Sequence, residues 1–263
     1  EQGIAKPRAS WDSKRIEAIS QEVIAGIDEN DEGVTLLNLG AVFEWAGKFE
    51  ESHALLLRAL EILGPAEDIY MRLASSSYSL GKPDDAFNYL KELQTLSPDF
   101  PGLNSKLGMI RLEQGKTGEA IAYCQAELES APGNHFPYVC MAKALAVKGE
   151  SEKAQTYFNT ALDLNPDSTF VRLSYTLYLI EHKRYDEALI HGHEALRINP
   201  ANYEAHNAIG SIMLSHGNLE QARHHISEAL RLQPDYDAAR ENLQRLQTGF
   251  GSADADQPRS RDM

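Results

Sequence analysis

Apolar residues recur at helical spacing over short stretches of the chain, and glycines or prolines separate most of these stretches. One stretch covers residues 203–216, and the next covers residues 219–232. Gly217 lies between them, and glycine tolerates the positive φ angles that end a helix. Pro234 follows the second stretch, and proline cannot continue a helix. The pattern therefore predicts two amphipathic helices joined by a tight turn.

The same pair of helices is predicted again and again along the chain, with a period of 34 residues. Three residue types keep this period: Pro98, Pro132, Pro166, Pro200 and Pro234; Ala86, Ala120, Ala154, Ala188 and Ala222; and Gly47, Gly81, Gly115, Gly149 and Gly217. Because three residue types share one period, the signal is specific for a repeat protein. The phase defines six repeats without insertions: 33–66, 67–100, 101–134, 135–168, 169–202 and 203–236.

The pattern of the repeats is leucine followed by glycine or alanine early, as in Leu73-Ala74 and Leu107-Gly108, then alanine in the middle, alanine again seven residues later, and proline near the end. A helix–turn–helix of this length and pattern resembles the tetratricopeptide repeat. The resemblance implies an all-α fold, a right-handed α-solenoid superhelix of six 34-residue repeats with terminal capping helices. It also implies a non-catalytic scaffold that binds other proteins on a concave surface lined by the first helix of each repeat.

Three repeats depart from this pattern. The departures are Ser52 and Gly64 in the first repeat, Asn104, Arg111 and Glu127 in the third, and Lys183 and Gly192 in the fifth. The third repeat carries polar side chains at positions that are usually apolar or small. We therefore expect it to be locally looser or bent.

A solenoid needs polar caps over its two terminal faces. Residues 1–32 contain an amphipathic stretch at 13–28, which predicts a cap or a degenerate half repeat. A segment that docks into the protein's own groove is the alternative. Residues 237–248 predict a C-terminal capping helix. Residues 249–263 are rich in Gly, Ser, Asp and Pro, so we expect a disordered tail.

In this family, positions 2, 5, 9 and 12 of each repeat face the concave groove. From these positions we expect a partner to contact Leu37, Met71, Tyr78, Met109, Leu112, Phe136, Val139, Lys143, Phe170, Leu173, Leu177, Ile180 and Asn207. This stripe is most apolar in the fourth and fifth repeats. A continuous apolar surface favours the binding of an amphipathic helix or an extended apolar peptide. Packing of these side chains on one another, or binding at another surface, remains an alternative.

Some members of the family bind the acidic C-termini of chaperones through a clamp of lysine, asparagine and arginine side chains. The clamp uses positions 5 and 9 of one repeat, position 6 of the next, and positions 2 and 6 of the third. In the first three repeats these positions carry Leu37, Ala41, Arg72, Gly102 and Lys106. The windows that start at later repeats do not match either, so we expect no carboxylate clamp.

The charge and the apolar runs of the chain disfavour two classes of partner, nucleic acids and membranes. The formal net charge is −14, which disfavours binding to the phosphates of nucleic acids. No apolar run approaches the roughly 18 residues of a membrane helix, so we expect no membrane insertion. The two cysteines, Cys124 and Cys140, exclude a disulfide framework and do not by themselves imply a single bridge. We expect a cytoplasmic protein, and a periplasmic or other compartment after signal removal stays open.

No pattern of residues predicts catalysis, a cofactor or a metal site. Gly115-Lys116-Thr117 resembles the end of a phosphate loop, but Ile110 stands where such a loop needs a glycine. Seven of the nine histidines lie in the last two repeats. Those at equivalent positions of neighbouring repeats are expected about 10 Å apart, too far to share one zinc ion. We therefore expect surface histidines, with an adventitious metal or a pH-sensitive surface as alternatives.

The leading interpretation is a scaffold or adaptor that binds a peptide or helix of a partner protein. A second interpretation is the recognition module of a larger enzyme, a transferase or hydroxylase whose catalytic domain lies elsewhere. A third is a self-assembling structural protein, a homo-oligomer whose groove takes the N-terminal helix of a neighbouring copy. A protein with its own catalytic activity is the last alternative, and we find no residues for it.

Overall fold

The computed structural model describes residues 31–253, with side chains up to residue 248. These residues form thirteen α-helices and no strand, which confirms the all-α prediction. The predicted helix at residues 13–28 lies outside the described residues. The described helices fall into two compact bodies that meet in the sequence between Leu164 and Asn165, here named the N-terminal body and the C-terminal body.

The N-terminal body contains α2 (Glu32–Trp45), α3 (Phe49–Leu63), α4 (Glu67–Ser79), α5 (Pro83–Leu96), α6 (Leu103–Glu113), α7 (Thr117–Ser130), α8 (Phe136–Val147) and α9 (Ser151–Leu164). The C-terminal body contains α10 (Thr169–Glu181), α11 (Tyr185–Ile198), α12 (Tyr203–Ser215), α13 (Leu219–Leu232) and α14 (Asp237–Ala253). The helices predicted at 203–216 and 219–232 agree with α12 and α13 to within one residue.

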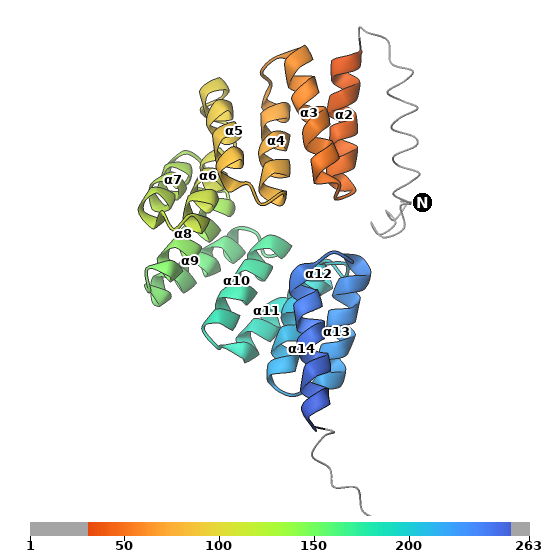
Figure 1. Cartoon of the computed structure of the whole chain (residues 1–263). Coiled ribbons are helices and arrows are strands. Elements are labelled where there is room, and N and C mark those ends of the chain that lie inside the picture. The colour runs from red at the N-terminus through yellow and green to blue at the C-terminus, as the bar shows by residue number, and fades with distance from the viewer. Residues whose placement is uncertain (1–30, 254–263) are drawn as a thin grey trace, which may run out of the picture. The chain divides into compact units, whose positions relative to one another are not determined.

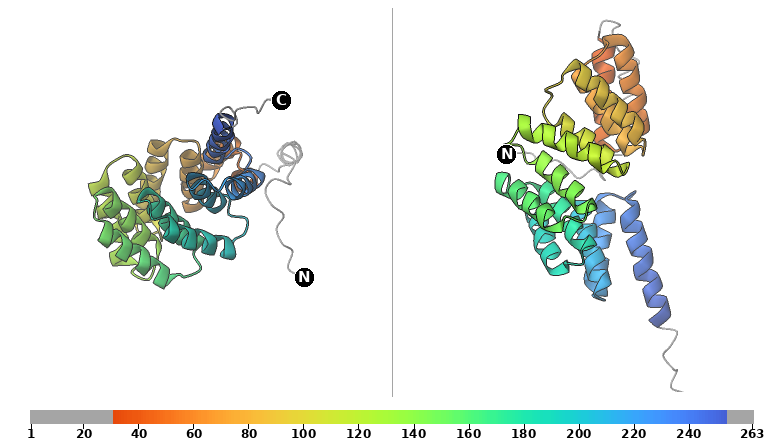
Figure 2. Two further views of the ribbon diagram at one scale, coloured as in Figure 1. Left: turned by 90° about the horizontal axis from the view of Figure 1, so that it is seen from below. Right: turned by 90° about the vertical axis from the view of Figure 1, so that its left-hand side faces the viewer.

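Helices α2 to α13 follow one another as antiparallel pairs, and each pair packs on the next pair of the same body (Figure 1). Two further views show the same pairing within each body (Figure 2). A tight turn joins the two helices of a pair. The glycines predicted in these turns, Gly47, Gly81, Gly115, Gly149 and Gly217, have φ angles between 70° and 78°. Lys183 occupies the same place in the fifth repeat with a φ of 59°, a region that residues with a side chain rarely adopt.

Small residues set the distance between the two helices of a pair. The mid-repeat alanines are all completely buried: Ala86, Ala120, Ala154, Ala188 and Ala222. Glycine has the same effect on the first helix. A Cβ atom added to Gly210 would lie 2.7 Å from Cγ1 of Ile226, well inside van der Waals contact. The helices therefore approach as closely as these residues permit, and a larger side chain at either place would force them apart.

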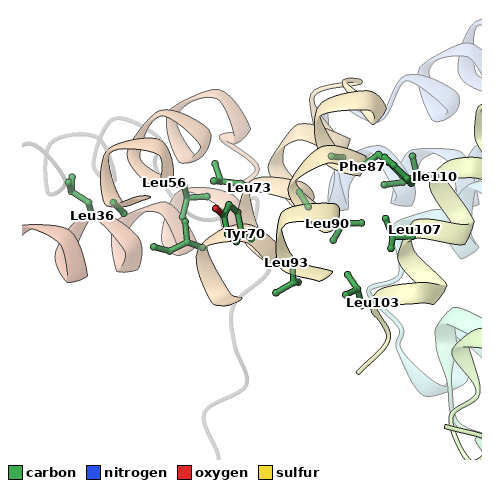
Figure 3. Close-up of a cluster of buried hydrophobic side chains, with 14 residues drawn as sticks. Leu36, Leu56, Tyr70, Leu73, Phe87, Leu90, Leu93, Leu103, Leu107 and Ile110 are labelled. Atoms are coloured by element: carbon green, nitrogen blue, oxygen red, sulfur yellow. The ribbon is translucent and has the colours of Figure 1, made fainter. Parts of the chain in front are cut away.

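The buried side chains form a core that continues from one repeat to the next. In the N-terminal body this core extends from Leu36 in α2 through Leu73 in α4 to Ile110 in α6 (Figure 3). Leu36 and Leu73 are completely buried. In this body the second repeat thus contributes to the core on both of its sides, as expected of a solenoid whose repeats touch only their neighbours.

The polar residues of the third repeat have defined partners. Glu127 of α7 is buried, and its carboxylate accepts hydrogen bonds from the main-chain N–H groups of Gly102 (2.7 Å) and Asn104 (3.0 Å). These N–H groups belong to the start of α6, where the first turn has no acceptors within its own helix. The carboxylate therefore caps α6 from the adjacent helix, and its negative charge suits the positive end of the helix dipole.

Asn104 and Arg111 are held in a similar way. The side-chain oxygen of Asn104 accepts a hydrogen bond from Nε2 of Gln94 at 3.1 Å. The guanidinium of Arg111 lies 3.5 Å from the centre of the Phe87 ring and 2.9 Å from a carboxylate oxygen of Glu119. These contacts give no support to the expectation of a looser third repeat, because its polar side chains bind the helices around them.

A disulfide joins the third repeat to the fourth. Cys124 of α7 and Cys140 of α8 are both buried, and their Cα atoms lie 5.8 Å apart. The two residues are separated by 16 positions in the sequence, and a cross-link over a loop of this length stabilises a fold by about 3 kcal/mol in the chain-entropy description. The number of cysteines alone did not imply this bond.

Helix α14 covers the end of the sixth repeat. Leu246 is completely buried and packs with Ile226 of α13. The helix is assigned from Asp237 to Ala253, and the boundary between cap and tail at residue 248 stays a prediction.

The capping role of Glu127 predicts that Glu127→Gln lowers the free energy of unfolding by about 2 kcal/mol, because one charge-assisted hydrogen bond to a part-buried N–H group is lost. Urea unfolding followed by circular dichroism measures this change. Glu129→Gln, two residues further along α7 and exposed, is the matched control and should leave the urea midpoint unchanged. Equal midpoints for the two variants would show that the cap contributes nothing.

The left-handed conformation of Lys183 predicts that Lys183→Gly raises the free energy of unfolding by up to about 1 kcal/mol. The gain arises because glycine adopts positive φ without steric cost, although its greater freedom in the unfolded chain offsets part of it. Thermal unfolding measures the effect, with Lys183→Ala as the control that keeps the Cβ atom. A melting temperature of Lys183→Gly below that of Lys183→Ala would contradict the prediction.

Candidate functional site

The predicted contact residues differ in how far they are exposed. In the N-terminal body, Tyr78 (45%) and Phe136 (43%) are exposed, and Leu37, Met71, Met109, Leu112 and Lys143 are partly buried. In the C-terminal body, Phe170 (38%) and Leu177 (43%) are exposed, and Ile180 is partly buried. These ten side chains present at least part of their surface to a partner.

Three predicted contact residues are buried instead. Val139 has no exposed surface, and Leu173 and Asn207 are each 8% exposed. All three occupy position 5 of their repeats, so the side chain at this position packs inside the protein in the fourth, fifth and sixth repeats. A partner cannot reach these side chains without repacking the helices around them.

The neighbours of position 5 explain its burial. Leu173 of α10 belongs to a small core with Ala205 and Ala208 of α12, which is the first helix of the next repeat. Asn207 of α12 accepts a hydrogen bond of 2.9 Å from the side-chain amide of Asn242 in α14. Position 5 thus points toward the following first helix, or toward the cap that takes its place. Positions 2, 9 and 12 form the accessible stripe of the first helices, and position 5 adds only the partly buried Leu37 and Met71 of the first two repeats.

Polar contacts between first helices occupy the stripe in the first two repeats. The carboxylate of Glu44 in α2 lies 3.1 Å from the guanidinium of Arg72 in α4, and it also accepts a hydrogen bond from the hydroxyl of Ser75. Asp68 lies 3.0 Å from the same guanidinium. This network was not among the features predicted from the sequence. The signal was present, because Glu44 and Arg72 carry opposite charges at positions 12 and 6 of consecutive repeats.

Tyr78 links the second repeat to the third. Its hydroxyl donates a hydrogen bond to the carboxylate of Glu113 in α6. Burial, the hydrogen bond and the nearby negative charge of Glu113 all raise the pKa of Tyr78 above its ordinary value of 10, in that order of size. The phenol therefore stays neutral and acts as a donor at physiological pH.

The apolar part of the stripe in the C-terminal body lies on α10. Phe170 and Leu177 are seven residues apart, and Ile180 follows after three more, so all three lie on one face of the helix. The helix begins at a defined place, because the hydroxyl of Ser168 accepts a hydrogen bond of 3.3 Å from the N–H of Val171. Leu173 anchors the same face in the core. The exposed side chains are thus held on a rigid element.

Between residues 31 and 253, no three His, Cys, Asp or Glu side chains are placed so that they could hold one metal ion. No helix within those residues has both the length and the apolar character that are needed to cross a bilayer.

Comparisons with known proteins agree with the repeat pattern. Models of the tetratricopeptide repeat family match residues 71–135, 141–203 and 179–247, which together make up more than half of the chain. The chain belongs to the tetratricopeptide repeat family. Membership of this family indicates a scaffold for interactions between proteins. A search among curated proteins found no match to the sequence.

Solved structures show the same fold. This tetratricopeptide repeat protein is similar to one from Parabacteroides merdae, with a TM-score of 0.71 and 16% identity over 89% of this chain and 90% of that one. It is similar to yeast Tom70, with a TM-score of 0.67 and 16% identity over 92% of this chain and 52% of that one. A third similar structure, the Cut9–Hcn1 complex of the APC/C, has a TM-score of 0.64 and 18% identity over 91% of this chain and 47% of that one. The chain thus spans about half the length of the Tom70 and APC/C chains that it matches.

Proposed function

We propose that this tetratricopeptide repeat protein is a non-catalytic adaptor that binds an amphipathic helix or an extended apolar peptide of a partner protein. The partner would lie along the accessible stripe of the first helices. The observation that carries the proposal is the face of α10, where Phe170 and Leu177 remain 38% and 43% exposed although the helix is firmly anchored by Leu173.

The chemistry of this face suits an apolar ligand. Full burial of a leucine or phenylalanine side chain is worth about 1.5–3 kcal/mol, so even partial burial of two such residues contributes appreciably to affinity. Their spacing of seven residues matches the spacing at which an amphipathic helix presents its own anchors. Because α10 is ordered before a partner arrives, binding would cost little conformational entropy on this side of the interface.

The contacts of Arg72 argue against an acidic C-terminus as the ligand. Arg72 is the one arginine at a position that the chaperone-binding clamp uses in the first three repeats. Its guanidinium already forms ion pairs with Glu44 and Asp68. A ligand carboxylate would have to displace both, and the neighbouring clamp positions carry Leu37 and Ala41, which offer no hydrogen-bond donor from a side chain.

The proposal predicts that the double variant Phe170→Glu/Leu177→Glu weakens binding of the partner by about 2 kcal/mol, or about 30-fold. The full chain is immobilised, and retained proteins are quantified by mass spectrometry. A protein that the double variant loses is then purified, and its dissociation constant is measured against each variant. Ile190→Glu is the matched control, because Ile190 is 67% exposed on α11, a second helix that does not line the stripe.

Circular dichroism and light scattering on the same samples separate partner binding from misfolding and from self-association. Equal dissociation constants for the folded double variant and for Ile190→Glu would refute the assignment of the stripe. A change of oligomeric mass in the double variant, with no change in binding to other proteins, would favour the self-assembling alternative.

A further inference from the structure

Four histidines meet where α11, α12 and α13 pack together in the C-terminal body. They are His193 of α11, His206 of α12, and His224 and His225 of α13, named here the histidine cluster. The ring centre of His225 lies 5.3 Å from that of His206, 5.3 Å from that of His224 and 6.2 Å from that of His193. His206 is buried, and His225 is partly buried.

The hydrogen bonds of His206 fix the positions of its protons. Nε2 of His206 lies 3.2 Å from the main-chain carbonyl oxygen of Pro200, and only a protonated nitrogen can donate to that oxygen. In the neutral ring, Nδ1 then carries the lone pair. Nδ1 of His225 lies 3.1 Å from it and must be the donor of this second bond. Both hydrogen bonds therefore form when both rings are neutral, with the proton of His206 on Nε2 and that of His225 on Nδ1.

An added proton at Nε2 of His225 keeps the Nδ1–H···Nδ1 bond but places a charge in the half-buried cluster beside His193, His206 and His224. Burial and the neighbouring rings oppose this charge. A second proton, at Nδ1 of His206, would place two N–H groups against each other across 3.1 Å and so remove the contact that holds α12 to α13.

The surrounding charges do little to favour protonation. From α13, Glu228 acts on His206, but its carboxylate already accepts two hydrogen bonds from Arg231, at 2.9 Å and 2.6 Å. His224 and Arg231 of the same helix oppose a positive charge on His206, and His193 of α11 opposes one on His225. Glu220 lines the open pocket beside His193, His224 and His225. Helix α14 packs on α12 and α13, and its buried side chains there, such as Leu246 and Asn242, carry no charge.

We propose that the histidine cluster is a pH-sensitive latch, which holds α11, α12 and α13 together while its rings are neutral and weakens when they are protonated. A metal ion between the two Nδ1 atoms is the competing reading. The proton is favoured because, in the described part of the chain, no third ligand completes a metal site around this pair.

The direction of the pH effect follows from the pKa values. Burial, and then the charges of His206, His224 and His193, lower the pKa of His225 from 6.5 to about 4, and burial likewise lowers that of His206. The unfolded chain therefore binds more protons than the folded chain in this range. The stabilisation is fully present above pH 6.5 and is lost as the pH falls toward 4.

Hydrogen exchange of the full chain at pH 7.5 and pH 5.0, with EDTA present, tests the latch. After correction for the intrinsic exchange rate, the opening constant of α12 and α13 should rise on the order of tenfold at pH 5.0 because of protonation at the cluster. This figure is reduced to allow for the solvent that reaches the half-buried rings. The double variant His206→Gln/His225→Asn should lose this rise, because amide side chains do not titrate.

His53→Gln is the matched control, because burial also lowers the pKa of His53 but the residue lies in the N-terminal body. This variant should retain the full pH response of α12 and α13. An equal rise in the double variant, or no rise in the unchanged protein, would overturn the proposal.

A measurement on the unchanged protein keeps the proposal testable if the double variant fails to fold. The proton NMR titration of the histidine rings should give pKa values for His206 and His225 below 6.5, and ordinary values for both would overturn the latch. In the last part of the experiment, EDTA is removed, zinc is added and the melting temperature is measured. If zinc raises the melting temperature at pH 7.5 and His225→Asn abolishes this rise, the histidine cluster is a metal site and not a pH-sensitive latch.

Discussion

Within each body, a helix pair completes its core by packing on the neighbouring pair or on the capping helix, and this shared core constrains the rest of the fold. The buried alanines and glycines bring the two helices of a pair close together. The side chains that remain on the first helix must then either pack on the following first helix or face the solvent. Leu173 packs on the following first helix and Phe170 faces the solvent, although they are three residues apart. The accessible stripe therefore consists of the first-helix side chains that do not pack into the shared core.

Buried polar groups distinguish the repeats from one another. An apolar core of nearly identical repeats would allow the pairs to slip in register, whereas a polar group inside the core is satisfied only by one partner. Glu127 caps α6, Asn207 bonds to Asn242 of the cap, and His206 bonds to His225. Each of these contacts joins two helices of the same body. In the C-terminal body the contact between His206 and His225 uses two side chains that titrate, and the pKa values of both lie below the ordinary histidine value.

The fold was predictable from sequence because its determinants are local. Proline, glycine and alanine at a fixed period define where helices end and where they touch, and α12 and α13 agree with those boundaries. The contact surface was predictable only in part, because the burial of a residue such as Leu173 depends on how the next first helix crosses it. Glu127 occupies a position that usually takes a small residue, and its partners are main-chain groups about 25 residues earlier, which no side-chain pattern reveals. The disulfide between Cys124 and Cys140 likewise needs the packing of one repeat on the next.

The central claim is that a partner protein lies along the accessible stripe of the first helices. Site-specific photo-crosslinking tests it most directly, with a benzophenone amino acid placed at Phe170 on the stripe or at Ile190 on α11, both of which are exposed. The account predicts that one partner protein is cross-linked from position 170, that its contact maps to an amphipathic or apolar segment, and that position 190 gives no such product. Cross-linking of the same partner from position 190 but not from position 170 would contradict the account.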